Sequence, residues 1–253
     1  MTSKHCVLVG GQLQIGCTAS IDDYVCDAAK PRATGRMRAL HIGVANGDAH
    51  KDEVEFETTY GAHRGCEVKH ARFIKNPAGA RDVILEDFDI IYLSGGNPRV
   101  FLLAEDLYNL QARLKRAYDS GSVIVGNSAG ALILGNCWTH PLTGKLTASR
   151  VYNAFNLVEN AAFFAHFNDY AGLLTEDGKP LPPERFLKAI HPVMKRRSTS
   201  TSGDFYSFGL WENSALAITW NQESGQQECS VRSLGEREIV YMNGKPVPDF
   251  VHR

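Results

Sequence analysis

The sequence predicts an α/β protein in which a mostly parallel central sheet carries helices on both faces. Short apolar runs typical of buried strands recur along the chain, and segments with helical spacing lie between them. Two of these runs end in glycine-rich turns, at Gly95–Gly96 and Gly126–Gly130, that lead directly into predicted helices. Strands that alternate with helices are typical of βαβ units, and active sites in such sheets lie beyond the carboxyl ends of the strands.

The predicted strands of this sheet are short; most are apolar runs, whereas polar and apolar residues alternate in Glu67–Phe73. They are expected at Cys6–Val9, Arg38–Ala45, Glu67–Phe73, Asp89–Leu93 and Val123–Val125. Residues 12–37 lack a clear period and contain Pro31 and Gly35, so we expect a loop with a short helix there. The segment Lys51–Gly65 has the mixed charge and the spacing of a helix.

The strongest helix signal follows the first glycine-rich turn. Asn97 can cap this helix, and Pro98 suits its first position. Apolar residues repeat at helical spacing from Val100 to Ala117, and Gly121 is placed to end the helix. The sequence therefore predicts one continuous helix between the two glycine-rich turns.

The C-terminal third of the chain has a different pattern. A helix is expected over Pro182–Ile190, and antiparallel, strand-rich segments over Phe205–Trp220 and Glu228–Val247. The pair Asn243–Gly244 is typical of a hairpin turn. Because no linker composition separates this part from the rest, we expect one domain over residues 1–253.

The composition excludes several classes of protein. The 27 basic and 28 acidic side chains give a net charge of −1, which does not favour binding to nucleic acid or to an anionic membrane. No apolar run approaches the roughly 20 residues that span a bilayer, and the first apolar stretch is too short for a secretory leader. The six cysteines form no C-x-x-C pair, so free thiols, a cytoplasmic protein and no metal or other cofactor are expected.

Residues 122–130 carry the clearest chemical signal. The run Val123–Val125 leads into Gly126-Asn127-Ser128-Ala129-Gly130, which matches the G-x-S-x-G nucleophile elbow in its strand-to-helix context. The glycines leave room for a tight, strained turn that exposes the Ser128 hydroxyl. The amide of Ala129 would then face a developing oxyanion. For these five residues alone, the alternative is a buried turn without chemistry.

A serine nucleophile needs a base, and His166 is the best placed of the nine histidines. It follows Ala161–Ala165, which is typical of a strand, and a base at the carboxyl end of a strand could reach Ser128. The pair Gly95–Gly96 lets backbone amides approach a substrate carbonyl, so Gly96 would complete an oxyanion hole. A histidine that only caps a strand and an ordinary glycine turn are the non-catalytic alternatives.

Together, Ser94-Gly95-Gly96-Asn97 and the segment Gly126–Ala131 resemble the dipeptidase E and cyanophycinase family of serine peptidases. The resemblance covers about residues 5–220 and implies a class I glutamine amidotransferase-like fold, which is a flavodoxin-like arrangement of three layers. Members of that family cut small acidic peptides or β-linked aspartyl polymers.

The resemblance also implies roles for individual residues. It makes Ser128 the nucleophile, His166 the base, and Gly96 and Ala129 the oxyanion donors. The positions that it implies for substrate binding are Gly95, Asn97, Asn127 and Arg185.

The usual acid of the triad is absent from its expected place. The family usually carries Asp or Glu midway between serine and histidine, where this chain reads Thr143-Gly144-Lys145-Leu146. Loss of the orienting acid costs about 10⁴ in turnover in the serine-protease precedent. The residues that could replace it are Asn168, Asp169, Glu159 and Glu212. A Ser–His dyad is the remaining arrangement.

The sequence favours a serine hydrolase that cleaves small peptides or amide-bonded acidic substrates through an acyl-enzyme on Ser128. The second hypothesis is a weakened or non-catalytic relative that acts as a ligand-binding or assembly protein. A glutaminase-like amidotransferase component is disfavoured, because the elbow holds serine and Cys137 lies outside it. The expected partner is a small peptide or acidic amide, and a homodimer is compatible with the sequence.

Overall fold

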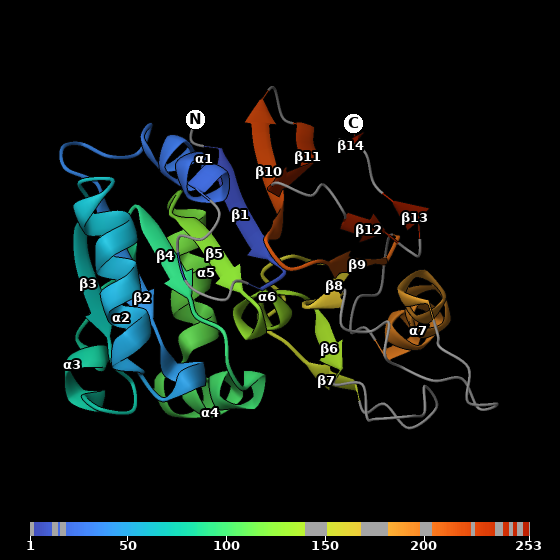
Figure 1. The fold of residues 1–253 in the computed structure, drawn as a ribbon, viewed down its shortest axis with the longest axis horizontal. Helices are drawn as coiled ribbons and strands as arrows, with labels where there is room; N and C mark the ends of the chain where they lie inside the picture. The colour runs from blue at the N-terminus through green and yellow to red at the C-terminus, as the bar shows by residue number, and fades with distance from the viewer. Residues whose placement is uncertain are drawn as a thin grey trace.

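The computed structural model describes residues 3–11, 15, 19–139, 151–167, 182–197, 204–223, 226–235, 240–242, 245–246 and 250–252. Its centre is an eight-stranded sheet with the order β14-β11-β10-β1-β5-β4-β2-β3 (Figure 1). Five strands are parallel to one another: β1 (Lys4–Val9), β2 (Arg38–Ile42), β3 (Glu67–Ala71), β4 (Ile90–Leu93) and β5 (Val123–Asn127). Three C-terminal strands extend the sheet antiparallel beyond β1: β10 (Ser214–Glu223), β11 (Gln226–Gly235) and β14 (Phe250–His252).

Helices cover both faces of this sheet, as the sequence predicts. An apolar core lies on each face of the sheet, and successive residues of β1 point into them in turn. Cys6 and Leu8 pack into the core on one face, and Val7 and Val9 pack into the core on the other. The first face is covered by α4 (Pro98–Tyr108), α5 (Leu110–Asp119) and α6 (Ala129–Leu134). The second face is covered by α1 (Ala19–Ala29) and α2 (His50–Phe56), and α2 continues as a π-helical turn over Glu57–Ala62. The short helix α3 (Pro77–Arg81) follows β3.

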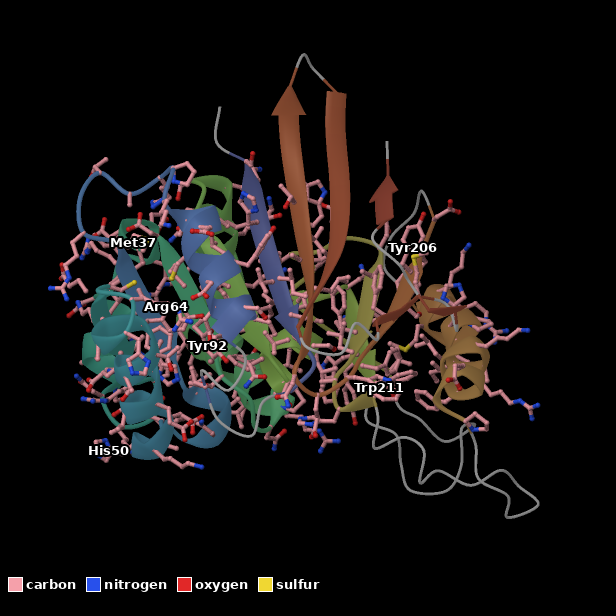
Figure 2. All side chains as sticks on the ribbon, turned by 45° about the horizontal axis from the view of Figure 1, so that its top comes forward. Met37, His50, Arg64, Tyr92, Tyr206 and Trp211 are labelled. Atoms are coloured by element: carbon pink, nitrogen blue, oxygen red, sulfur yellow. The ribbon has the colours of Figure 1, made fainter. Side chains whose placement is uncertain are left out.

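A second, smaller sheet lies beside α7 (Pro183–Arg197), on the right of Figure 1. Its order is β13-β12-β9-β8, and β8 (Ala161–Phe164) runs parallel to β9 (Tyr206–Leu210). The remaining elements are β12 (Val240–Met242), β13 (Lys245–Pro246) and the pair β6 (Cys137–Thr139) and β7 (Val151–Asn153). Trp211 packs against the apolar cluster between this sheet and α7 (Figure 2). The predicted hairpin turn at Asn243–Gly244 lies outside the described residues.

The prediction of one helix between the glycine turns is wrong. The structure has two helices, because Asn109 takes a left-handed conformation with φ 52° between α4 and α5. Its amide still donates to the Glu105 carbonyl at 2.8 Å, so the residue closes one helix and opens the next. Asparagine is the non-glycine residue that most readily adopts this conformation, and apolar periodicity does not register a single such position.

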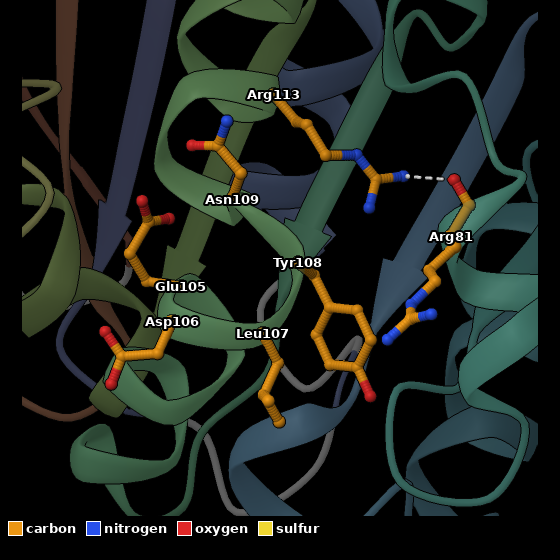
Figure 3. A pocket seen from close by; sticks show the side chains of 7 residues that line it. All are labelled: Arg81, Glu105, Asp106, Leu107, Tyr108, Asn109 and Arg113. Atoms are coloured by element: carbon orange, nitrogen blue, oxygen red, sulfur yellow. Dashed lines mark hydrogen bonds between the residues drawn. The ribbon is translucent and has the colours of Figure 1, made fainter.

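A pocket of about 560 Å³ opens at this break (Figure 3). Its lining residues are Arg81, Glu105, Asp106, Leu107, Tyr108, Asn109 and Arg113. Arg113 donates to the Arg81 carbonyl at 3.4 Å across it. The pocket contains none of the predicted site residues; Gly95, Gly96 and Asn97 precede the opposite end of α4.

The strand β2 and the helix α7 are among the segments that differ from their predicted bounds. The strand β2 ends at Ile42, because Gly43 begins a 3₁₀ turn over Val44–Asn46. The helix α7 continues past Pro192 to Arg197, since apolar residues such as Met194 extend its buried face. Four cysteines, Cys6, Cys26, Cys66 and Cys137, are buried free thiols. None of the helices in the described ranges is both long and apolar enough to cross a membrane.

Candidate active site

Ser128 stands at the junction of β5 and α6 in strained backbone. Its φ of 51° and ψ of −109° lie where an L-residue is rarely found, and its amide donates to the Val9 carbonyl at 3.0 Å. A Cβ on Gly126 would lie 2.5 Å from the Gly130 carbonyl oxygen, and a Cβ on Gly130 would lie 2.9 Å from the Leu93 Cβ. Both flanking positions therefore require glycine for the turn to close. The side chain of Ser128 stays partly exposed above the sheet.

His166 lies directly against this hydroxyl. Its Nε2 is 2.8 Å from the Ser128 Oγ, and the residue follows β8 with a φ of 50°. Its amide donates to the Gly10 carbonyl at 2.6 Å. Gly11 has a φ of 140°, and a Cβ there would lie 2.7 Å from the His166 Nδ1. Gly11 was not predicted as part of the site, although the Gly10–Gly11 pair at the end of a predicted strand was the available signal.

Glu212 is the group on the far side of the imidazole. Its Oε1 is 2.9 Å from the His166 Nδ1, and it lies between β9 and β10. The next residue, Asn213, has a φ of 56° and donates its amide to the Gly11 carbonyl at 2.9 Å. The side chains of His166 and Glu212 are 39% and 34% exposed. The site is thus open to solvent rather than sealed.

Of the replacement acids that the sequence left open, the structure places Glu212 on the imidazole. Asn168 and Asp169 lie outside the described residues. Glu159 is an exposed residue just before β8. Because an ionised carboxylate only accepts hydrogen bonds, Glu212 keeps the proton of the neutral imidazole on Nδ1. The Nε2 is then left as an acceptor that faces the Ser128 hydroxyl.

The Gly95–Gly96 turn faces the same hydroxyl. A Cβ on Gly95 would lie 3.2 Å from the Ser128 Cβ and 3.7 Å from its Oγ. Gly96 has a φ of 131°, and a Cβ there would lie 2.6 Å from the Ala45 carbonyl carbon. Ala129 supplies the first amide of α6, at the end of a helix where backbone N–H groups lack partners within the helix.

The predicted substrate-binding residues have different surroundings. Asn127 is buried, and its Oδ1 has no hydrogen-bond partner among the described residues. The Asn97 side chain caps α4 by accepting from the Arg99 amide at 3.1 Å. Arg185 is an exposed residue of α7. Arg99, which no sequence pattern singled out, is an exposed cation at the start of α4 that donates to the Tyr152 hydroxyl at 2.8 Å.

The sequence profile of peptidase family S51 matches residues 9–219, a range that includes Ser128, His166 and Glu212. The chain belongs to peptidase family S51. The resemblance to the dipeptidase E and cyanophycinase family is thereby confirmed. Within the described residues, this S51 chain has no group of three or more His, Cys, Asp or Glu side chains that could hold a metal ion.

The chain is also similar in sequence to a protein that is named as a peptidase. An uncharacterized peptidase of Bacillus subtilis (strain 168), YgaJ, is 28% identical to the S51 chain over 119 residues. The aligned part is 47% of this chain and 48% of YgaJ, so the chain spans about half the length of that relative.

Two solved structures share the fold of the S51 chain. A peptidase from an acI-B1 Actinobacterium matches with a TM-score of 0.63 and 21% identity, over 98% of this chain and 93% of that one. A candidate peptidase E protein from Listeria monocytogenes EGD-e matches with a TM-score of 0.52 and 16% identity, over 93% of this chain and 100% of that one. At these identities the likeness establishes the α/β fold alone.

Proposed function

We propose that this S51 protein hydrolyses small peptides or amide-bonded acidic substrates through an acyl-enzyme on Ser128. The observation that carries the proposal is the unbroken hydrogen-bonded sequence from Ser128 through His166 to Glu212, at 2.8 Å and 2.9 Å. A nucleophile, a base and a group that orients the base are the three parts that acyl transfer requires.

In this mechanism the Ser128 Oγ attacks the scissile carbonyl while its proton passes to the His166 Nε2. The imidazolium that forms is stabilised by the Glu212 carboxylate on its other nitrogen. His166 then gives the proton to the leaving amine, and the acyl-enzyme remains on Ser128. Water enters by the same route, with His166 as base, and releases the acid product.

Two backbone amides are suited to hold the oxyanion of the tetrahedral intermediate. The Ala129 amide begins α6, so the helix dipole favours negative charge beside it. Gly96 is exposed, next to a residue that approaches Ser128 closely. Removal of one such donor costs about 10²- to 10³-fold in turnover in the known precedent.

A preference of the enzyme for acidic substrates requires a cationic side chain near the Gly95–Gly96 turn. Arg185 is the residue that the family resemblance implies. Arg99 is the second candidate, because it lies in the first turn of α4, directly after the oxyanion turn. Its guanidinium is also held over the Tyr152 ring at 5.2 Å, which limits its rotation.

A fluorophosphonate probe tests the proposal, because it reacts with an activated serine and leaves an ordinary hydroxyl unmodified. We expect a mass increase on Ser128 in the wild-type protein and none in Ser128→Ala. The matched control is Ser120→Ala, which removes the hydroxyl that caps α5 and should label like the wild type. A wild type that stays unlabelled would contradict the proposal and favour a non-catalytic relative. Hydrolysis of free glutamine is expected to be absent.

A further inference from the structure

Three consecutive carbonyl groups at the end of β1 each accept a backbone amide from a triad residue or from its neighbour in the chain. The pairs of acceptor and donor are Val9 with Ser128, Gly10 with His166, and Gly11 with Asn213, at 3.0 Å, 2.6 Å and 2.9 Å. Asn213 directly follows Glu212 in the chain. We refer to Val9–Gly11 as the strand-end segment.

The order of the main sheet explains why one short segment reaches all three parts of the triad. Strand β1 lies between β5, which ends directly before Ser128, and β10, which begins at Ser214 (Figure 1). The Gly10 amide donates to the Ser214 carbonyl at 2.9 Å, so the segment is also joined to the start of β10. His166 follows β8 of the second sheet. The strand-end segment is therefore in backbone contact with residues that both sheets supply.

The three amide donors share an unusual backbone conformation. Their φ values are 51° for Ser128, 50° for His166 and 56° for Asn213, in a region that residues other than glycine rarely adopt. Such a conformation persists only where the surrounding structure enforces it. The hydrogen bonds to the strand-end segment are a constraint that all three residues have in common.

Gly10 leaves no room for a side chain on the side of Glu212. A Cβ there would lie 2.6 Å from the Leu210 carbonyl carbon, and closer still to the Trp211 carbonyl oxygen. Both atoms belong to the backbone, so they cannot swing aside as the end of a flexible side chain can. A substitution at Gly10 would therefore push the loop that carries Glu212 away from β1.

Gly11 leaves no room for a side chain on the side of His166. A Cβ there would lie 2.7 Å from the His166 Nδ1 and 2.9 Å from its Nε2, the two atoms that contact Glu212 and Ser128. Among the described residues, the three atoms nearest to that Cβ all belong to the imidazole. A substitution at Gly11 would therefore displace the ring itself.

We propose that the strand-end segment positions the triad, with Gly11 setting the place of the imidazole and Gly10 the place of the Glu212 loop. The inference rests on the proposed function, because the triad is catalytic only if Ser128 is the nucleophile. Successive members of the triad are 38 and 46 residues apart in the chain, so a common support fixes their relative positions. A misplacement of about 1 Å can cost about 10²-fold in rate. Gly10 and Gly11 are positioning residues that act through Glu212 and His166.

The rate at which a fluorophosphonate probe labels Ser128 tests the role of Gly11. We expect Gly11→Ala to lower this rate about 10²- to 10⁴-fold, up to the contribution of a general base. On a peptide substrate kcat should fall and KM should not change. In the His166→Ala background, where no imidazole can be displaced, the same substitution should cause no further loss. A Gly11→Ala variant that is labelled like the wild type, or an equal loss in both backgrounds, would overturn the proposal.

The same design tests Gly10 against Glu212. We expect Gly10→Ala to lower the labelling rate by no more than Glu212→Ala does, and to cause no further loss in the Glu212→Ala background. Equal losses in both backgrounds would show that Gly10 does not act through Glu212. The matched control is Gly65→Ala, because Gly65 has a φ of 70° and a Cβ there would meet no described atom within 4 Å. This control should be labelled at the wild-type rate.

Asn213 supplies a second test, which decides the matter if Gly11→Ala does not fold. Asn213→Gly keeps the amide that donates to Gly11 and readily adopts the φ of 56°. Asn213→Val keeps the amide too, but a β-branched residue strongly disfavours this conformation. We expect Asn213→Val to be labelled about 10²-fold more slowly and Asn213→Gly to stay near the wild-type rate. Equal losses in the two variants would assign the effect to the asparagine side chain and contradict the proposal.

Thermal unfolding separates this proposal from the proposed function, because it does not use activity. We expect Gly11→Ala to lower Tm by about 2 to 12 °C in the wild type, and by less in the His166→Ala background. If this difference is found but the wild type is not labelled, the peptidase proposal fails and the contact between Gly11 and the imidazole stands. If the wild type is labelled but Gly11→Ala has the same effect in both backgrounds, the positioning proposal fails and the peptidase proposal stands.

Discussion

Two of the serine–histidine pairs in the described part of the chain have nearly equal hydrogen bonds and opposite surroundings. The Ser128 Oγ lies 2.8 Å from the His166 Nε2, and the Ser94 Oγ lies 2.6 Å from the His41 Nε2. The first pair is partly open to solvent, whereas the second is enclosed in the sheet. The hydrogen bond to histidine therefore does not by itself distinguish a nucleophile from a structural hydroxyl.

Backbone conformation and the third partner make the difference. Ser94 continues the ladder of β4, since its amide donates to the Ile42 carbonyl of the neighbouring strand, and its hydroxyl points into the protein. Ser128 breaks its strand with a positive φ, which turns the hydroxyl out of the sheet. The Nδ1 of His166 is hydrogen bonded to the Glu212 carboxylate, whereas the Nδ1 of His41 is hydrogen bonded to the imidazole of His70. Only the first arrangement stabilises an imidazolium at the site.

The largest effect that tests this contrast is expected from Glu212→Gln. The amide could donate to the His166 Nδ1 and favour the wrong tautomer, so kcat/KM should fall about 10²- to 10⁴-fold. The lower part of that range applies if solvent partly replaces the carboxylate, which is one-third exposed. Steady-state kinetics on a peptide substrate measures the loss.

The matched control for Glu212 is Glu159→Gln, which removes the exposed carboxylate just before β8. We expect its kcat/KM to equal that of the wild type. If Glu159→Gln were the inactive variant and Glu212→Gln the active one, the assignment of the triad acid would be wrong.

A smaller effect is expected on the free energy of unfolding, and it comes from His41 of the buried Ser94–His41 pair. Burial lowers the pKa of His41 in the folded state to about 3, whereas the unfolded chain has an ordinary histidine pKa of about 6.5. Between these values the unfolded state binds one more proton, so the free energy of unfolding falls as the pH falls. From pH 6.5 to pH 5 this group should contribute a loss of about 2 kcal/mol.

Urea denaturation of the wild type and of His41→Gln at both pH values measures that slope. The variant can be less stable at every pH, but its stability should change less between the two values than that of the wild type. Variant His63→Gln removes an exposed histidine and should keep the wild-type slope. Equal slopes in His41→Gln and wild type would show that His41 is not the buried neutral group.

The sequence could predict parts of the Ser128 and Ser94 pairs only where the residues that form them lie close together along the chain. The elbow is contiguous, so the two glycines and the apolar strand before Ser128 could be recognised together. His166 could be proposed because a strand pattern ends beside it. Glu212 remained one of several candidates, because its approach depends on the left-handed Asn213 and the parallel pairing of β8 with β9.

The buried pair of Ser94 and His41 and its contact with His70 were not predicted at all, for a similar reason. His41 and His70 meet only because β2 and β3 pair in parallel with these residues directly opposite each other. Single histidines inside apolar strands give no periodic signal. The break at Asn109 was missed because a left-handed residue leaves the apolar spacing on both sides almost intact. Contacts distant in sequence and single-residue backbone conformations are thus the features that pattern analysis loses.

The smallest expected effect concerns the choice of substrate at the open pair. We expect Arg99→Gln to raise KM about 2- to 5-fold for a peptide with an acidic side chain and to leave a neutral analogue unchanged, because an exposed ion pair stabilises by no more than about 1 kcal/mol. Arg185→Gln is the matched variant on α7, and we expect a smaller change there, since α7 packs against the second sheet rather than beside the oxyanion turn. Parallel KM measurements on both peptides separate the two. A larger effect of Arg185→Gln than of Arg99→Gln would indicate that Arg185, the residue that the family resemblance implies, binds the acidic side chain of the substrate.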